Sequence, residues 1–192
     1  PQTEGSTMTA AALLAAARTL SRALARLDFP PPVAHVYDPL TYAWAPYEEY
    51  VTRFGDGRRR VVLLGMNPGP FGMVQTGVPF GEVAAVRDWM RIRAPVERPR
   101  REHPKRPIEG FACPRSEVSG RRLWSWAAKR FGSAEAFFGD WFVLNYCPLA
   151  FLEASGRNFT PDKLPAALLA QVHAARDRHL AAALTALAPA FA

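Results

Sequence analysis

The sequence is poor in cysteine and histidine, the residues that most often cross-link small domains or hold structural metals. It has two cysteines and four histidines among 192 residues. Cys113 and Cys147 lie far apart and form no Cys-x-x-Cys pair, which argues against a disulfide framework and favours a reducing compartment. The histidines also lack the closely spaced partners that metal sites show. We therefore expect no metal site.

Long hydrophobic runs are missing as well. No stretch approaches the roughly 20 apolar residues that a membrane-spanning helix needs. The Ala- and Leu-rich stretch that begins at Ala10 is interrupted by Arg18, Arg22 and Arg26, so it does not resemble the apolar region of a signal peptide. These absences predict an intracellular protein that enters no membrane. It would be cytoplasmic in a bacterium and nuclear in a eukaryote.

Acidic residues are fewer than basic residues. The chain has 24 Lys or Arg against 17 Asp or Glu, a formal net charge of +7. Residues 91–130 alone hold twelve Lys or Arg and four Glu, a local net charge of +8, so the excess lies in one segment. Such a patch suits a polyanion, above all nucleic acid. A solvated loop that serves only solubility is the alternative for this segment.

The apolar pattern predicts a single domain that mixes helices and strands. Residues 1–8 are interpreted as a flexible leader and residues 9–192 as the domain. Residues 61–64 and 141–144 are continuous apolar runs, typical of strands buried on both faces, and the second ends at Asn145. Helices are predicted over residues 9–27, 46–54, 82–92, 119–131, 133–138 and 164–187, and a weak third strand over residues 33–37.

This inventory of elements is short of strands. Two strong parallel strands do not make a stable covered sheet. The last predicted helix has the form of a crossover to another parallel strand, yet the sequence ends within five residues of it. We expect a three-layer α/β/α domain with a central, mostly parallel sheet whose C-terminal strand is missing. The resulting exposed sheet edge would favour self-association, and the complete protein would be a monomer.

The most informative segment is the loop that follows the first strong strand. Residues 65–82 read GMNPGPFGMVQTGVPFGE. Open α/β sheets bind ligands at the carboxyl ends of their strands, and glycines let a backbone approach a ligand closely. A rigid strand-to-helix connection without chemistry is the alternative. No Gly-Lys-Ser/Thr follows, so the segment is not a Walker loop.

This segment closely resembles the signature of single-strand-selective monofunctional uracil-DNA glycosylases, members of the uracil-DNA glycosylase superfamily. The resemblance covers most of residues 33–165. Its other motifs are VYDP (36–39), YAW (42–44), YVTR (50–53), HPKRP (103–107), CP (113–114), SEVSG (116–120), NYCPL (145–149) and SGRN (155–158). The resemblance implies the fold of that superfamily, DNA as the partner, base-excision repair as the process, and neither a metal nor an organic cofactor.

The resemblance also implies residue roles. Asn67 would position the water that attacks the sugar, Phe80 would stack on the flipped uracil, and Asn145 would read its Watson–Crick edge. The Met66 backbone would contact the base, and the backbone from Gly69 to Met73 would shape the site near C5. Together with the basic segment, the DNA-contacting residues would be Arg100, Arg101, Lys105, Arg106, Ser155, Gly156, Arg157, Asn158 and Lys163.

Physical chemistry agrees with these roles. A stacked base must be extruded at a cost of a few kcal/mol, and stacking on an aromatic face returns about 1–3 kcal/mol. An Asn amide can donate to uracil O4 and accept from N3–H, which cytosine cannot match. Without the resemblance, a polar cap at a strand end would be the better interpretation of Asn145.

The expected activity is hydrolysis of the N-glycosidic bond of uracil, and of oxidised uracils substituted at C5, in single- and double-stranded DNA. The motif loop has no Lys for a Schiff base, which favours an enzyme that does not cut the strand. The His-Pro-Ser-Pro motif that assists the leaving group in this family does not occur in the sequence. A lesion-binding protein without turnover is therefore the alternative, and a hydrolase of free nucleosides is a weaker one.

Overall fold

The structure is a computed structural model that describes residues 4–192, with side chains from residue 8 onward. The elements are, in chain order, α1 (Glu4–Leu24), β1 (His35–Tyr37), α2 (Pro39–Tyr42), α3 (Trp44–Phe54), β2 (Val61–Gly65), α4 (Met73–Thr76), a π-helical turn η1 (Ala85–Trp89), a 3-10 turn η2 (Gly110–Ala112), α5 (Val118–Phe131), α6 (Ala134–Asp140), β3 (Trp141–Asn145), β4 (Ala150–Leu152), β5 (Asn158–Phe159), a 3-10 turn η3 (Pro161–Lys163) and α7 (Ala166–Leu187).

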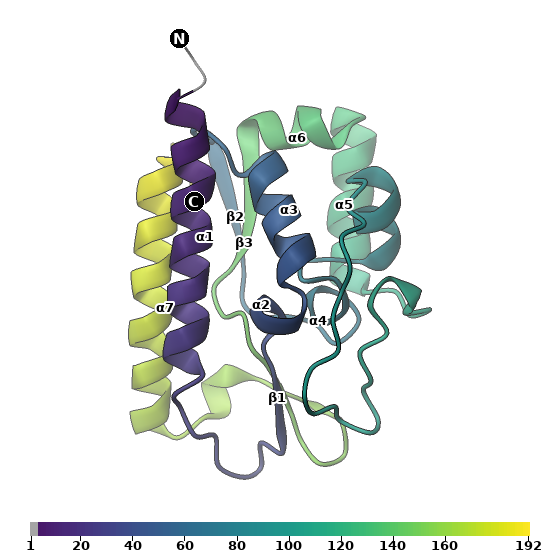
Figure 1. The fold of residues 1–192 in the computed structure, drawn as a ribbon, viewed down its shortest axis with the longest axis vertical. Coiled ribbons are helices and arrows are strands. Elements are labelled where there is room, and N and C mark those ends of the chain that lie inside the picture. The colour runs from purple at the N-terminus through teal and green to yellow at the C-terminus, as the bar shows by residue number, and fades with distance from the viewer. Residues whose placement is uncertain (1–3) are drawn as a thin grey trace.

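The two strong predicted strands pair in parallel. β2 and β3 run side by side in a register that sets Gly65 opposite Asn145. Figure 1 shows this pair between the helices α1 and α7 on one side and α5 on the other. The mixed α/β class is therefore confirmed. Burial on both faces holds for β3 from Phe142 onward, whereas Leu64 of β2 is 42% exposed.

The predicted third strand belongs to another sheet, which is a correction. β1 pairs antiparallel with β4, and β4 pairs antiparallel with β5. The sequence pattern missed β4 and β5 because both are very short and lie within a segment that reads as loop. A central sheet of more than two parallel strands is not present within residues 4–192. Phe191, beyond α7, forms one parallel bridge with Val61.

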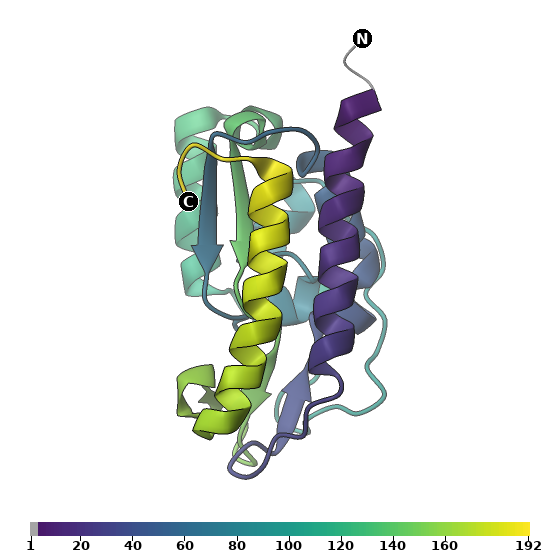
Figure 2. The same cartoon turned by 90° about the vertical axis from the view of Figure 1, so that its left-hand side faces the viewer.

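The two long helices α1 and α7 pack along one another, as Figure 2 shows with α7 toward the viewer. The helix predicted over residues 9–27 is confirmed, and its leucines Leu13, Leu20 and Leu24 are almost fully buried. α1 begins at Glu4, so residues 4–8 of the predicted leader are helical, and residues 1–3 lie outside the described residues. Within the described residues, no helix is long and apolar enough to cross a membrane.

Aromatic side chains pack α3 against the parallel strand pair and α6. The Tyr50 ring stacks on Phe142 at 5.1 Å, and the Phe54 ring stacks on Phe138 at 4.3 Å. The Tyr50 hydroxyl donates to the Val143 carbonyl at 2.9 Å, which satisfies a polar group in the core. These contacts fix the position of α3 relative to β3, and so the position at which β3 ends.

The other predicted helices are confirmed with shifted ends, except one. Residues 82–92 form only a short turn around η1, in which the Met90 N–H donates to the Ala85 carbonyl five residues back. The chain then turns sharply at Arg91, whose φ is +57°. α5 begins at Val118, one residue before its predicted start, with Glu117 at its N-cap.

Candidate active site

The motif loop after β2 is largely buried, although it is a loop. Residues 72–79 are all buried, and they include α4, which ends at Gly77 in the left-handed conformation. The Tyr42 hydroxyl donates to the Val74 carbonyl at 2.6 Å. The loop therefore has a fixed shape before any ligand binds.

Gln75 joins this loop to the basic segment. Its side chain is 3% exposed, and its amide nitrogen donates to the carbonyls of Pro70 and Pro107. Its amide oxygen accepts from the N–H groups of Glu109 and Gly110 at 2.8 and 3.1 Å. A buried amide with every partner supplied holds its neighbours in a single arrangement.

Phe80 has an unusual backbone conformation. Its φ is +53°, which a non-glycine residue adopts at a cost that the surroundings must offset. The Trp124 indole N–H donates to the Phe80 carbonyl at 2.8 Å, and the Glu82 N–H donates to the same oxygen at 2.7 Å. Gly120 packs so closely that an added Cβ would lie 2.2 Å from that oxygen. These contacts direct the Phe80 ring toward the ends of the strands.

Gly65, Phe80 and Asn145 meet at the carboxyl end of the parallel pair. A Cβ on Gly65 would lie 2.3 Å from the Asn145 Oδ1 and 2.6 Å from the Phe80 ring. Glycine is therefore required where these two side chains converge. The Asn145 amide nitrogen donates to the Met73 sulfur at 3.1 Å, and sulfur is a weak acceptor. The Phe80 ring and the buried Asn145 amide, whose nitrogen has one weak hydrogen-bond partner, therefore lie close together at this strand end.

Met66 and Asn67 lie on another side of the same strand end. Met66 is 67% exposed, and Asn67 is half-buried with its amide nitrogen 3.4 Å from the Pro68 carbonyl. Both line a cavity of about 360 Å³ that also includes residues from η3 and α7. The cavity lining does not include Phe80 or Asn145, so the predicted residues fall into two clusters.

The Glu117 carboxylate packs against the turn of the motif loop at Gly69 and Gly72. A Cβ on Gly69 or Gly72 would lie 2.1 or 2.5 Å from the Glu117 carboxylate. One oxygen of Glu117 accepts from the Ser119 hydroxyl at 2.7 Å, while the other is buried without a hydrogen-bond partner. The start of α5 therefore closes one wall of the loop.

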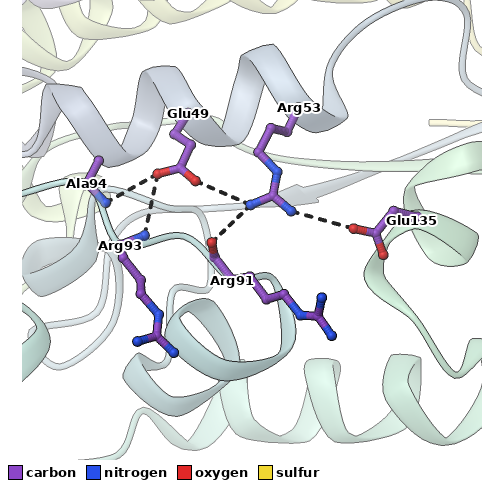
Figure 3. A network of polar contacts seen from close by, with 6 residues as sticks. All are labelled: Glu49, Arg53, Arg91, Arg93, Ala94 and Glu135. Carbon is purple, nitrogen blue, oxygen red and sulfur yellow. Dashed lines mark hydrogen bonds and ion pairs between the residues drawn. The ribbon is translucent and has the colours of Figure 1, made fainter.

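The basic segment is fastened to the fold at its start. Figure 3 shows Glu49 of α3 accepting from the N–H groups of Arg93 and Ala94 at 3.4 and 3.2 Å. Arg53 donates to the Arg91 carbonyl at 3.1 Å and reaches Glu135 of α6. Further along, the His103 N–H donates to the Tyr37 hydroxyl at 2.8 Å. The first part of the segment is thus a loop attached to the fold at several points, with exposed side chains between them.

The structure brings the two predicted DNA-contacting segments together. The turn between β4 and β5 packs on the basic segment, because a Cβ on Gly156 would lie 3.1 Å from Lys105 and 3.2 Å from the His103 ring. The Arg106 guanidinium lies 5.6 Å from the Phe71 ring centroid, which connects the basic segment to the motif loop. The predicted side chains that are exposed are Arg100, Arg101, Lys105, Ser155, Arg157, Asn158 and Lys163.

Two of the predicted DNA-contacting residues have limits on that role. The Arg157 guanidinium forms a bidentate pair with Glu153 at 2.9 to 3.1 Å, so its charge is partly neutralised. Arg106 is half-buried, and its Nε has no hydrogen-bond partner. Arg100, Arg101, Lys105 and Lys163 are the predicted cations that are exposed and have no ion pair within the described residues.

A larger cavity, of about 600 Å³, lies at Arg100 and Arg101 and is lined by residues from α1, β1 and α2. Burial, followed by the nearby charges of His103 and Arg101, lowers the pKa of His35 on its wall. We do not assign the site to this cavity because it contains no residue of the motif loop. Both cysteines are free thiols, and no cluster in the described residues could hold a metal ion.

Known proteins resemble the chain over most of its length. It is 55% identical over 147 residues to "Single-strand selective monofunctional uracil DNA glycosylase" of Mus musculus, which covers 77% of this chain and 53% of that protein. The Rattus norvegicus and Bos taurus proteins of that name are 55% and 54% identical over the same length. The chain is a homologue of the single-strand-selective monofunctional uracil-DNA glycosylases. It spans about half the length of the curated relatives that it matches.

The fold has a solved counterpart as well. The crystal structure of SMUG2 from Pedobacter heparinus superposes with a TM-score of 0.56 at 21% identity, over 89% of this chain and 70% of that one. At this identity the likeness concerns the fold alone. No protein-family model matches the chain. The resemblance to the glycosylase family is confirmed, while the residue roles remain predictions.

Sequence reasoning missed several residues that shape this homologue's site. Gln75 and Trp124 support the motif loop through hydrogen bonds that cross from distant segments. Their only signal was a polar group within an apolar motif or helix face. His173 and Arg176 of α7 lie on the cavity beside Asn67, and nothing in their spacing from the motif could have placed them there.

Proposed function

We propose that the chain carries the base-recognition and water-positioning part of a monofunctional uracil-DNA glycosylase. This enzyme would hydrolyse the N-glycosidic bond of uracil in single- and double-stranded DNA, as a step of base-excision repair. The observation that carries the proposal is the meeting of the Phe80 ring and the Asn145 amide over Gly65, two residues before Asn67 in the sequence. The homology to named glycosylases supports it.

Base recognition would rest on Asn145. Its amide nitrogen would leave the weak Met73 sulfur and donate to uracil O4, while its oxygen would accept from N3–H. Little is lost in this exchange because the thioether is a poor acceptor. Cytosine presents a donor and an acceptor in the reverse order, so it would leave both groups of a buried amide opposed.

The Phe80 ring would hold the extruded base. Extrusion costs a few kcal/mol, and stacking on an aromatic face returns about 1–3 kcal/mol per base. The Phe80 backbone is strained, and its carbonyl accepts two hydrogen bonds that hold it in place. The ring is therefore oriented before a base binds. Less conformational freedom would then be lost when the base arrives.

Asn67 would orient the attacking water at the sugar. Uracil leaves as an anion from an oxocarbenium-like sugar, so the reaction needs an oriented water and stabilised negative charge more than it needs a strong base. No Asp or Glu occurs between Gly65 and Gly81, in agreement with this chemistry. No Lys occurs there either, so strand cleavage through a Schiff base is not expected.

Oxidised uracils substituted at C5 would be further substrates. The backbone from Gly69 to Met73 would face C5, and the Glu117 carboxylate packs against this turn at Gly69 and Gly72. The exposed cations of the basic segment, with the β4–β5 turn beside them, would contact the phosphates. These contacts would provide affinity without base specificity. A DNA-repair role would place the protein in the compartment that holds DNA.

The test is release of free uracil from a labelled oligonucleotide that contains one uracil. The proposal expects free uracil and an abasic site in an intact strand, and no release of thymine from the matched oligonucleotide. Retention of the uracil oligonucleotide without release would identify a lesion-binding protein instead. Release of uracil from deoxyuridine but not from DNA would identify a nucleoside hydrolase.

A further inference from the structure

The cavity beside Asn67 contains a buried arginine that the proposed base-recognition site does not use. Arg176 of α7 is 2% exposed, although arginine is almost never fully buried unless it is paired. The cavity has a volume of about 360 Å³. Its lining consists of Met66, Asn67, Thr160, Pro161, Asp162, Leu169, His173 and Arg176.

Arg176 has no carboxylate partner within the described residues. One Nη donates to His173 Nδ1 at 3.1 Å, and the guanidinium carbon lies 4.3 Å from the centroid of the Tyr146 ring. The Nε has no hydrogen-bond partner. Arg176 also forms a hydrogen bond with the Cys147 thiol, so its partners in the described residues are an imidazole nitrogen, a thiol and an aromatic face. A desolvated cation without a carboxylate is an unbalanced charge, which favours an anion in the adjoining cavity.

The same contacts indicate which ring nitrogen of His173 accepts a hydrogen bond and which one donates. Arginine only donates, so His173 Nδ1 must accept from it, and the ring proton must lie on Nε2. The Tyr146 hydroxyl lies 3.1 Å from the same Nδ1, but it donates its hydrogen bond to the Asp177 carboxylate. That bond also occupies Asp177, the carboxylate next to Arg176 in sequence. His173 is therefore left with one N–H donor, on a ring that lines the cavity.

The cavity adjoins the residue that would act at the sugar. His173 and Arg176 stand three residues apart on one face of α7, and Tyr146 directly follows Asn145. We propose that His173 and Arg176 form a subsite for a phosphodiester group that flanks the flipped nucleotide. The subsite rests on the proposed function, because the phosphate of that nucleotide is bonded to the sugar on which Asn67 would act.

Asp162 lines the same cavity and has the opposite charge. It is exposed at the rim, where solvent screens it, whereas Arg176 is buried. The subsite therefore predicts effects of opposite sign for the two residues. Asp162→Asn should strengthen binding of a phosphate, and Arg176→Met should weaken it.

The experiment measures binding of single-stranded oligonucleotides that contain one uracil, by fluorescence anisotropy at fixed salt. In two of them a neutral methylphosphonate replaces the phosphate on the 5′ or the 3′ side of the uracil. One replacement should weaken wild-type binding roughly 10- to 100-fold, the range expected for a charge-assisted hydrogen bond. Arg176→Met should weaken binding of the natural oligonucleotide by a similar factor and lose the sensitivity to that methylphosphonate.

Two further variants control for folding and for total charge. Arg178→Met removes an exposed cation from the same helix and should keep the sensitivity of the wild type. Arg176→Lys keeps the charge and should keep part of it. Met replaces a buried cation with an apolar side chain of similar length, and an unchanged thermal midpoint verifies that the variant is folded.

Equal wild-type affinity for all three oligonucleotides would overturn the subsite, as would undiminished sensitivity in a folded Arg176→Met. If inorganic phosphate alone raised the thermal midpoint of the wild type but no methylphosphonate mattered, the anion would be free phosphate, and the DNA assignment would be wrong. Failure of the proposed function gives a different result: no uracil is released, while the methylphosphonate comparison still gives its answer through binding.

Discussion

The motif loop and the basic segment touch one another, yet they are built in contrasting ways. Residues 72–79 of the motif loop are buried; Tyr42 donates a hydrogen bond to the Val74 carbonyl, and the Gln75 side chain donates to the Pro70 carbonyl. The basic segment is attached at a few points, and Arg100, Arg101 and Lys105 extend into solvent. Orientation of a reacting bond needs a rigid wall, whereas attraction of a polyanion needs only charge at the surface.

The largest expected effect concerns Asn67. Asn67→Ala should lower the rate of uracil release on the order of 10²–10³-fold, the loss typical of one positioned polar group. Binding of the uracil oligonucleotide should change little, because Asn67 would act on water. As a contrast, Asn158→Ala in the β4–β5 region should reduce affinity more than the rate. Single-turnover release and anisotropy measure the two quantities separately.

The second effect concerns base choice at Asn145, the last residue of β3. Asn145→Asp should weaken uracil excision, since an ionised carboxylate cannot donate to O4. It should also admit cytosine, whose exocyclic amino group is a donor. Competition between uracil and cytosine oligonucleotides measures this change. Unaltered uracil excision would make Asn145 a structural cap of β3.

The third effect concerns the joint between the two regions. Gln75→Leu leaves two carbonyls and two N–H groups without their partner, and each buried group left unsatisfied costs about 1–3 kcal/mol. The free energy of unfolding should fall by at least that amount, and uracil release should fall with it. Gln171→Leu changes the same residue type on the exposed face of α7 and should leave denaturant unfolding unaltered.

The fourth effect concerns the basic segment alone. Replacing Arg100, Arg101, Lys105 and Arg106 with Ala should reduce the logarithmic salt slope of DNA binding by up to about 3, since each phosphate contact contributes roughly 0.7–0.9. Replacing Arg22, Arg26, Arg58 and Arg178, which are exposed on other surfaces, removes the same charge and should change the slope less. Equal slopes in the two variants would mean that only net charge matters.

The smallest effect concerns stability far from both regions. Burial lowers the pKa of His179 from 6.5, although a hydrogen bond with the Ala16 backbone opposes this shift. The unfolded chain therefore binds a proton at a higher pH than the folded chain does. The free energy of unfolding should decline as pH falls from about 6.5 toward the lowered pKa. His179→Leu should flatten this part of the profile in denaturant titrations.

The same contrast explains what the sequence could predict. The two apolar runs became β2 and β3, and the long amphipathic helices became α1 and α7, because continuous burial leaves a local pattern. The strand at residues 33–37 was assigned to the wrong sheet, since its partner β4 is three residues long and leaves no such pattern. The meeting of Phe80 and Asn145 over Gly65 depends on strand register, which no local pattern encodes.

The site was predictable only where a motif carried it. Asn67, Phe80 and Asn145 were found through a family signature, and the structure adds the contacts that hold them. Trp124, Glu117 and Arg176 reach the site from distant segments, and each does so through tertiary packing. Side chains of this kind have no sequence signal apart from their polarity, so a structure was needed to identify them.

The central claim is that the motif loop performs chemistry and the basic segment performs binding. One paired measurement tests it: the single-turnover rate of uracil release at saturating protein, with the dissociation constant of the same oligonucleotide, for Asn67→Ala and for the fourfold Ala variant of Arg100, Arg101, Lys105 and Arg106. We predict that the first variant loses rate and keeps affinity, while the second loses affinity and keeps its saturated rate. Equal losses of rate and affinity in both variants would contradict this division of roles.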